Sequence, residues 1–490
     1  MTVEDRRDSP PVRAGGDDAV GVRIADERTP LLRKGESSSS SSGGGGFGDR
    51  EFDGASFAGA VFNLSTTIIG AGIMALPATM KVLGLALGIA AIILVAALTD
   101  FSVRMLMRFS KAGGATSYGD VMAAAYGDFG RRLLQACVVI NNIGLLVVYM
   151  IIIGDVLSGS SSDGVHHAGV LEGWFGPHWW TGRFFVLVVT TLSVFTPLAC
   201  FKRIDSLRHT SAVAVLLALV FLVVTAGIAV AKCIQGSIEM PRLLPKVTTD
   251  IDSIGALFTA VPVLVTAYVC HFNVHNIENE LDNPADIKPV VRASLLLCSI
   301  TYIMISFFGF LLFGDNTLDD VLANFSTDLG IPFSSLLNDV VRVSYALHLM
   351  LVYPVIFYPL RLNMDGLLFP SSTRLADSNV RFATITIALI TVAFLGANFI
   401  PSIWDAFQFT GATASVCLAF IFPAVIALRD APRIGSRKDK IAAILMVILA
   451  AFADLMAIYS DSVSIFKENS SPSGMLTRRF GGSGAAAWKG

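Results

Sequence analysis

Long apolar runs, separated by shorter polar segments, dominate the chain from residue 55 onward. A bilayer core about 30 Å thick needs about 20 mostly apolar residues per helix. Runs of this length predict eleven spans, at residues 55–80, 82–108, 132–158, 183–200, 208–232, 251–275, 290–313, 338–360, 380–400, 404–428 and 440–460. The pattern therefore predicts an all-α polytopic membrane domain over residues 55–460, followed by a tail at 461–490.

The first and sixth of these spans carry residues that interrupt a helix. The first contains Gly70 and Gly72, one residue apart, and then Pro77; the sixth contains Pro262 and then the partly polar run 266–271. Backbone that leaves the helix inside a membrane is tolerated only where it is buried in protein or lines a cavity. Interruptions five spans apart predict two inverted repeats, spans 1–5 and 6–10, with a binding site between them.

The chemistry of half-helix ends indicates what such a site binds. Free N–H groups at a half-helix N-terminus suit a carboxylate, and the opposing carbonyls suit a cation or an α-ammonium group. The predicted substrate-binding residues are Ile69, Gly70, Ala71, Gly72 and Ile73 in the first span and Ala267, Tyr268, Val269 and Cys270 in the sixth. The alternative for the two glycines is close helix packing through small residues. The pattern favours a secondary transporter for a zwitterionic or anionic small molecule.

Charge is concentrated at the N-terminus. Hydrophobic residues make up 53% of the chain and charged residues 15%, yet residues 1–54 hold 8 of the 36 Lys and Arg and 11 of the 38 Asp and Glu. This tail, with its run of serines and glycines at 37–46, predicts a disordered cytosolic segment. Within it, Glu27, Leu31 and Leu32 have the spacing of an acidic dileucine signal read by adaptor proteins, or form a chance leucine pair.

The distribution of Lys and Arg predicts the orientation. With the N-terminus in the cytosol, 26 of the 36 fall in cytosolic segments. The N-terminus is therefore expected in the cytosol and the C-terminus on the other side. The glycosylation candidates Asn324 and Asn469 fall on that non-cytosolic side.

Several function classes are excluded by the composition and the motifs. A net charge of −2 gives no footprint for nucleic acid. The six cysteines show no metal-ligand spacing and are expected to be apolar packing residues. The sequence has no nucleophile elbow, phosphate loop or zinc motif, so we expect neither an enzyme nor a cofactor or metal.

Four segments carry a family resemblance: Phe62–Ser65 with Gly70–Pro77, Leu207–Ser211, Tyr268–His271 with Glu280 and Leu281, and Tyr353–Phe357. In these segments the chain resembles the amino acid/auxin permease family, and it is most similar to the vacuolar amino acid transporter branch. The resemblance spans residues 55–460. It implies an amino acid transporter of the LeuT-like (APC) fold, with a 5+5 inverted repeat, broken helices 1 and 6 and one extra helix. The branch implies export of amino acids from the vacuole.

The coupling ion is less clearly indicated. The resemblance implies that sodium-coupled members pair an Asn in the first helix, here Asn63, with a Thr in the eighth. That second position falls near Met350 or Val352, which have no side-chain oxygen. His271 and His348 are the ionisable candidates for proton coupling, with neutral histidines hydrogen-bonded between helices as the alternative.

Three functions remain open at this point. The leading prediction is proton symport of free amino acids across the vacuolar or another internal membrane, towards the cytosol, by a carrier surrounded by membrane lipid. The second is sodium-coupled uptake at the plasma membrane. The third is an amino acid sensor that has little flux and signals through its tail.

Overall fold

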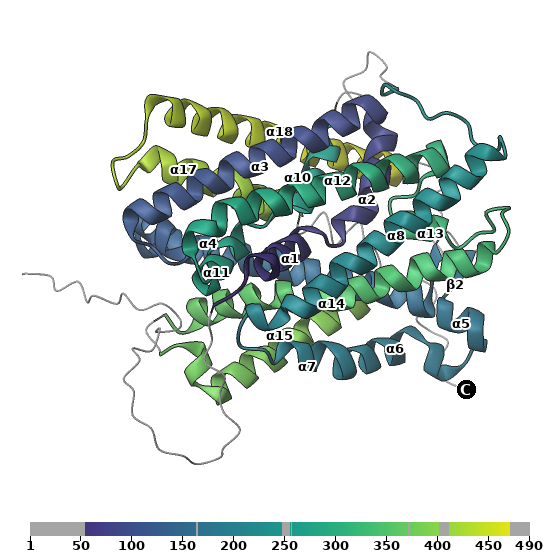
Figure 1. Ribbon diagram of the computed structural model, residues 1–490, viewed down its shortest axis with the longest axis horizontal. Helices are drawn as coiled ribbons and strands as arrows, with labels where there is room; N and C mark the ends of the chain where they lie inside the picture. Colours follow the sequence, from purple (N-terminus) through teal and green to yellow (C-terminus); the bar gives the residue numbers. More distant parts are fainter. Residues whose placement is uncertain are drawn as a thin grey trace, which may run out of the picture. The chain divides into compact units, whose positions relative to one another are not determined.

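The computed structural model describes residues 54–162, 165–246, 255, 257–370, 373–400 and 411–470 of the chain. These residues form helices together with a short antiparallel hairpin, β1 (Gly159–Ser162) and β2 (Val165–Ala168) (Figure 1). The all-α expectation is therefore confirmed for the membrane domain. The sorting signal predicted at Glu27, Leu31 and Leu32 lies outside the described residues.

Six of the described helices are long and apolar enough to cross a membrane. They are α3 (Leu85–Gly113), α4 (Tyr118–Ser158), α8 (Arg208–Ile234), α12 (Ile287–Phe313), α14 (Ser334–Leu368) and α15 (Asn379–Phe399). A bent pair, α1 (Phe57–Ile68) and α2 (Gly72–Leu83), makes seven if it counts as one span. Length and composition of the described helices thus support six or seven spans, and the predicted count of eleven is not confirmed.

The other predicted spans coincide with shorter or interrupted helices. They contain α6 (Arg183–Thr190) with η2 (Thr191–Phe195) and α7 (Thr196–Ala199), α10 (Ala260–Tyr268) with α11 (His271–Glu280), η7 (Gly411–Ser415) and η8 (Cys417–Ile421) with α17 (Phe422–Arg429), and α18 (Arg437–Ser470). The segments η2 and η8 are π-helical, and a proline, Pro197 or Pro423, follows each within two residues. Proline has no N–H group and clashes with the preceding turn, which favours such a local widening of the helix.

The connections carry the remaining short elements. These are α5 (Val170–Phe175), η1 (Trp179–Thr181), η3 (Asp205–Leu207), η4 (Pro284–Asp286), η5 (Gly314–Asn316), α13 (Val321–Asn324) and η6 (Leu375–Asp377). Helix α4 contains a kink at Tyr126 and Gly127, where Gly127 has a φ of 66°. Glycine adopts this left-handed backbone without a steric penalty, so the first turns of α4 can leave the direction of the span.

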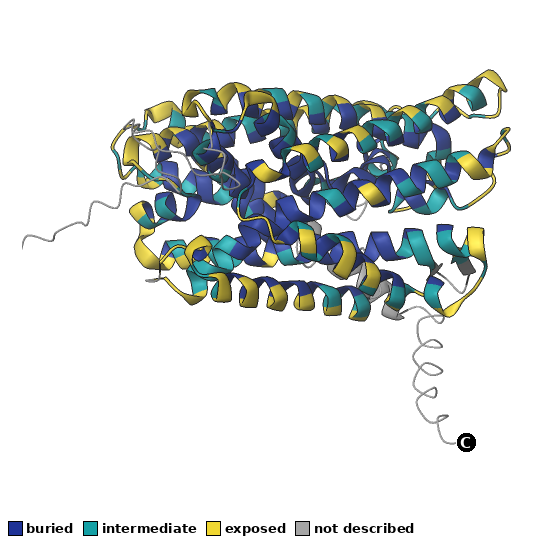
Figure 2. Cartoon of the chain, turned by 60° about the horizontal axis from the view of Figure 1, so that its bottom comes forward, coloured by how far each residue is buried: buried dark blue, intermediate teal, exposed yellow. Residues whose placement is uncertain are grey.

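The described helices pack in two groups. The bundle group comprises α1, α2, α3, α10, α11 and α12, and the scaffold group comprises α4, α6, α7, α14 and α15. Helix α8 contacts α1 and α12 of the first group and α14 of the second. Buried residues lie between the helices and exposed ones on the outward faces (Figure 2). This arrangement suits a membrane domain, in which helices meet along their buried faces and present apolar side chains to lipid.

We call the end of the domain at which α1 begins the inner end and the end at which α2 finishes the outer end. At the inner end, where α1 begins, the Ala55 N–H donates to the Glu280 carbonyl at 2.7 Å. At the outer end, where α2 finishes, the N–H groups of Leu85 and Ala86 donate to the carbonyls of Arg242 and Leu243. These bonds cap the start of α3, whose first N–H groups have no partner within the helix.

Candidate functional site

The break in the first span lies at the predicted position. Helix α1 ends at Ile68, Ile69 is extended with a ψ of 101°, and α2 begins at Gly72 with a bend of 55°. Backbone hydrogen bonds are described for the N–H groups of Ile69, Ile73 and Met74; within the described part of the chain none is recorded for those of Gly70, Ala71 and Gly72. The predicted residues therefore include donor groups left over by the break.

The sixth span is broken as well. Helix α10 ends at Tyr268, Val269 is extended with a ψ of 114°, and α11 begins at His271. The two breaks touch: a Cβ added to Gly72 would lie 2.8 Å from the Cβ of Ala267 and 2.9 Å from its Cα. The structure thus brings the two halves of the predicted site together. It also shows that Gly72 permits close packing against Ala267, as the alternative interpretation of this glycine expected.

A tyrosine hydroxyl lies between the ends of α1 and α10. The Oη atom of Tyr302, on α12, is 2.6 Å from the Ile68 carbonyl oxygen and 2.8 Å from that of Ala267. Both carbonyls belong to the final turn of a half-helix, where they have no partner within the helix. The point between them therefore favours a hydrogen-bond donor or a positive charge.

Two further tyrosines approach the same break from the scaffold group. The Tyr345 hydroxyl, on α14, donates to the Gly70 carbonyl at 2.8 Å. The Tyr149 hydroxyl, on α4, faces the N–H of Ala71, and a Cβ on Gly70 would overlap it. Sequence reasoning missed these two residues and Tyr302. The available signal was a tyrosine inside an apolar span, because a buried hydroxyl needs a hydrogen-bond partner.

His348 links α14 to α8 and to the broken helix. Its Nδ1 lies 2.7 Å from the Ala214 carbonyl oxygen and must donate to it, since a carbonyl only accepts. The ring also faces the Ile69 carbonyl and stacks on Tyr345. Its Nε2 has no partner among the described residues. Protonation of Nε2 would add a second donor next to the break.

His271 has a different environment. Its Nε2 lies 3.1 Å from the Ser102 Oγ, and this hydroxyl is hydrogen-bonded to the Ala419 carbonyl at 2.5 Å. His271 is therefore assigned as a neutral ring that donates to Ser102. It is also the first residue of α11, where the partial positive charge of the helix N-terminus disfavours a second proton. Of the two predicted histidines, His348 has the environment better suited to a cation.

Asn63 ties α1 to the loop before α8. Its Nδ2 donates to the Ile204 carbonyl at 3.0 Å, and its buried Oδ1 has no partner among the described residues. Met350 and Val352 are buried and offer no oxygen, as the sequence indicated. Asn273, on α11, donates to the Thr67 hydroxyl on α1 and to a carbonyl of α14. These amides hold α1, α11 and α14 together on the inner side of the breaks.

A buried carboxylate closes the inner end. Glu280, at the end of α11, accepts the N–H groups of Ile204 and Asp205 at 3.1 and 2.7 Å. Burial raises the pKa of this carboxyl, while the two hydrogen bonds act in the opposite direction. The contact fixes α11 against the loop that leads into α8.

Charged groups gather at the outer end. Asp320 precedes α13 and accepts the Leu322 N–H at 2.9 Å. The pKa of Asp320 is raised to about 7: burial is the main cause and the nearby Asp155 acts in the same direction, while the Leu322 hydrogen bond and Arg342 oppose them. Asp155 itself forms an ion pair with Arg183. The outer end therefore holds a carboxyl whose pKa is raised towards neutrality.

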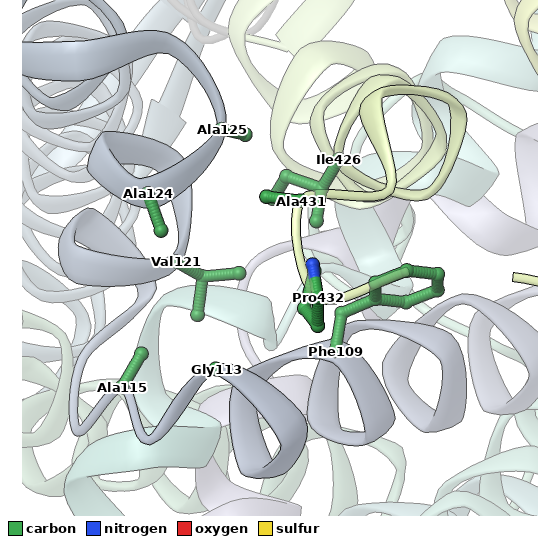
Figure 3. A pocket seen from close by; sticks show the side chains of 9 residues that line it. All are labelled: Phe109, Gly113, Ala115, Val121, Ala124, Ala125, Ile426, Ala431 and Pro432. Carbon is green, nitrogen blue, oxygen red and sulfur yellow. The ribbon is translucent and has the colours of Figure 1, made fainter. Parts of the chain in front are cut away.

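The residues of the site are buried from both ends. The exposed fraction is 1% for Ile69 and Ala71, 2% for Ala267 and Val269, and 0% for Cys270. A small pocket at the inner end, between α3, α4 and α17, is lined by apolar side chains such as Phe109, Val121 and Ile426 (Figure 3). It offers no charged side chain to an amino acid. The described residues thus enclose both breaks.

The remaining predicted residues lie elsewhere. Asn324 is at the outer end, where its Nδ2 donates to the Asn316 carbonyl and its Oδ1 accepts the Leu318 N–H. Asn469 lies near the end of α18, on a part of the helix whose side chains are not described. Among the described residues no group of three or more His, Cys, Asp or Glu is placed to hold a metal ion.

Comparison with known proteins identifies relatives over most of the chain. The family model described as transmembrane amino acid transporter protein matches residues 53–466. Amino acid transporter AVT6A of Arabidopsis thaliana is 66% identical over 419 residues, which cover 86% of this chain and 91% of the relative. AVT6B of the same plant is 61% identical over 454 residues, covering 92% and 98%. The sodium-coupled neutral amino acid symporter 2 of Danio rerio is 25% identical over 421 residues, covering 81% and 80%.

Solved structures with the same fold are also transporters. The manganese transporter of Eremococcus coleocola matches with a TM-score of 0.54 at 14% identity, covering 86% of this chain and 90% of that one. Mhp1, a nucleobase-cation-symport-1 family transporter in a closed conformation, matches with a TM-score of 0.51 at 14% identity, covering 84% and 90%. These similarities concern the fold alone, and they confirm the predicted LeuT-like (APC) architecture. Relatives and fold belong to transporters and not to enzymes.

Proposed function

The chain belongs to the transmembrane amino acid transporter family, and on this premise we propose that it is a proton-coupled symporter that moves amino acids from the vacuole or another internal compartment to the cytosol. The observation that carries the proposal is the meeting of two broken helices, with the N–H groups of Gly70 and Gly72 unpaired among the described residues and helix-end carbonyls on both. A zwitterion presents a carboxylate and an ammonium group to these two features.

The substrate carboxylate binds at the break in the first span. The N–H groups of Gly70 and Gly72 are available donors among the described residues. The Ala71 N–H donates to the Tyr149 hydroxyl, whose own O–H is a third donor there. Binding by backbone donors is charge-assisted and independent of the substrate side chain. The ammonium group binds near the carbonyls of Ile68 and Ala267, at the other side of the junction. Both ends of an α-amino acid are thereby held.

The proton binds to His348. In the neutral ring Nδ1–H is committed to the Ala214 carbonyl, and Nε2 faces the broken helix with no partner among the described residues. A proton on Nε2 lets the ring donate towards the Ile69 carbonyl as well. This extra bond links α14 of the scaffold group to the first span of the bundle group. Protonation therefore stabilises the closed, loaded arrangement of the two groups.

The outer end faces an acidic compartment in this proposal. The Lys and Arg distribution puts the inner end in the cytosol, and the signal at Glu27, Leu31 and Leu32 would direct the protein to the vacuole through adaptor proteins. With a pKa of about 7, Asp320 is uncharged at acidic pH and charged near neutrality. An uncharged Asp320 is compatible with its partly buried position, which supports an acidic medium on this side.

Uptake into proteoliposomes tests the proposal. The purified full chain is supplied with a panel of labelled amino acids under proton and sodium gradients imposed separately. We expect a proton gradient alone to drive accumulation, and His348→Gln to abolish that dependence while amino acid exchange continues. His271→Gln is the matched control and should retain proton-driven uptake. Accumulation that ignores the proton gradient, or a loss confined to the His271 variant, would contradict the assignment.

Sodium coupling is the alternative. It is supported by the buried Oδ1 of Asn63, which has no partner among the described residues and is an oxygen of the kind that sodium binds. The same assay separates the two ions, since sodium-driven accumulation lost in Asn63→Ala would establish this alternative. A chain that binds amino acids but transports none under either gradient would indicate a sensor.

A further inference from the structure

The Tyr302 hydroxyl offers one hydrogen-bond donor to two carbonyl acceptors. Its single O–H group lies at hydrogen-bonding distance from two carbonyl oxygens, 2.6 Å from Ile68 and 2.8 Å from Ala267. One proton cannot make a full hydrogen bond to both oxygens at the same moment. The two carbonyls end different half-helices, and all three residues are buried. A group with two or more N–H or O–H donors at this point would satisfy both carbonyls.

We propose that the Tyr302 hydroxyl occupies the ammonium subsite of the empty carrier and thereby allows the carrier to return without a substrate. The inference rests on the proposed function, and it adds to that function the residue that takes the place of the substrate. A substrate ammonium group has three N–H donors and satisfies both carbonyls, so it replaces the hydroxyl there. When the substrate leaves, the hydroxyl again prevents the two buried carbonyls from being left without a partner.

The surroundings of Tyr302 support this exchange of partners. The residue belongs to α12, in the same group as both broken helices, so its hydroxyl stays with the two carbonyls when the groups move against each other. Its ring packs edge-on against Tyr268 with 5.1 Å between the centroids. Tyr345 and Tyr149, in contrast, contact the break from the scaffold group. Tyr302 is thus the tyrosine of the three whose contact with the carbonyls is independent of that motion.

The consequence concerns two modes of transport. Net transport includes a step in which the carrier changes conformation while empty, and exchange of one amino acid for another does not. Removing the hydroxyl leaves buried carbonyls unpaired only in the empty state, which slows that step by roughly tenfold or more. The loaded states keep their ammonium partner. Exchange is therefore preserved, and the substrate is bound more tightly because nothing competes for its subsite.

The test compares Tyr302→Phe with Tyr118→Phe in proteoliposomes. Tyr118 is a matched control, because it is a buried tyrosine outside the predicted site whose hydroxyl donates to one backbone carbonyl, that of Leu418, at 2.9 Å. For Tyr302→Phe we expect the ratio of net uptake to exchange to fall roughly tenfold or more and KM for exchange to fall. For Tyr118→Phe the ratio should stay at the wild-type value. Equal losses of net uptake and exchange in Tyr302→Phe would overturn the inference.

A second measurement does not depend on the folding of a variant. Wild-type protein is challenged with N-methyl, N,N-dimethyl and N,N,N-trimethyl forms of its best substrate as competitors. We expect competition to weaken with each N–H group removed, and to be lost for the trimethyl form, which has no donor for the carbonyls. A trimethyl form that competes as well as the parent would also overturn the inference. If wild-type protein transports no amino acid in either mode, the proposed function fails instead.

Discussion

A Cβ at position 70 should be tolerated only when the Tyr149 hydroxyl is removed. In Gly70→Ala the added methyl group would overlap the hydroxyl oxygen and lie 3.1 Å from Cζ of the same ring. The ring belongs to α4 and is fully buried, so it has little room to move away. Tyr149→Phe deletes the atom that clashes and leaves only the tolerable contact to Cζ. The second substitution is therefore expected to rescue the first.

The size of the effect follows from the packing. Forcing an extra methyl group into a filled interior costs about 1–3 kcal/mol. Tyr149→Phe alone removes one hydroxyl interaction, for about 0.5–1.5 kcal/mol. Because the two changes share one clash, the double variant should be more stable than the sum of the single effects implies. The coupling energy should be about 1 kcal/mol or more, in the range found for residues in contact.

Gly72→Ala supplies the control, since its clash is with Ala267 and not with Tyr149. Thermal midpoints of the detergent-solubilised proteins, followed by fluorescence-detected size-exclusion chromatography, measure all variants. Tyr149→Phe should raise the midpoint of Gly70→Ala and leave that of Gly72→Ala lower than wild type. Equal effects of Tyr149→Phe on both glycine variants, or no effect on either, would refute the described geometry of the break.

Three further predictions concern the two ends and the tail. Glu280→Ala leaves two buried N–H groups unpaired, at about 1–3 kcal/mol each, whereas Glu280→Gln keeps an acceptor; the alanine variant should have the lower thermal midpoint, and the reverse order would contradict the contact. Because the pKa of Asp320 is raised to about 7 in the folded protein, the folded state loses stability as the pH rises from about 4 to 7. Asp320→Asn should therefore gain more stability over wild type at pH 8 than at pH 5, and an equal gain at both would count against this. Leu31→Ala with Leu32→Ala should move the protein towards the cell surface, and unchanged localisation by imaging would argue against the sorting signal.

The positions of the helix breaks and the side chains that contact them have different origins. Local sequence was enough to predict where the helices break, because glycine and proline act on their own turn of the chain. Gly70 and Gly72 weaken α1 whatever packs against it, and the run 266–271 ends α10 in the same manner. The all-α membrane class, the family and the positions of both breaks were therefore accessible from the sequence.

Partners across the helices were not accessible in this way. Tyr149, Tyr302 and Tyr345 are ordinary tyrosines in apolar spans until packing brings their hydroxyls to one break. The same holds for the histidines: His348 and His271 look alike in the sequence, and only the tertiary structure shows their different partners, the Ala214 carbonyl and the Ser102 hydroxyl.

The physical reason lies in the range of the interactions. A helix break depends on the backbone preferences of a few consecutive residues, which the sequence states directly. A hydrogen bond such as that of Tyr302 to Ile68 joins residues 234 positions apart, and its existence depends on how several helices pack together. Sequence alone therefore determined that the first and sixth spans open their backbone, and only the tertiary structure decided which hydroxyls and which imidazole meet that backbone.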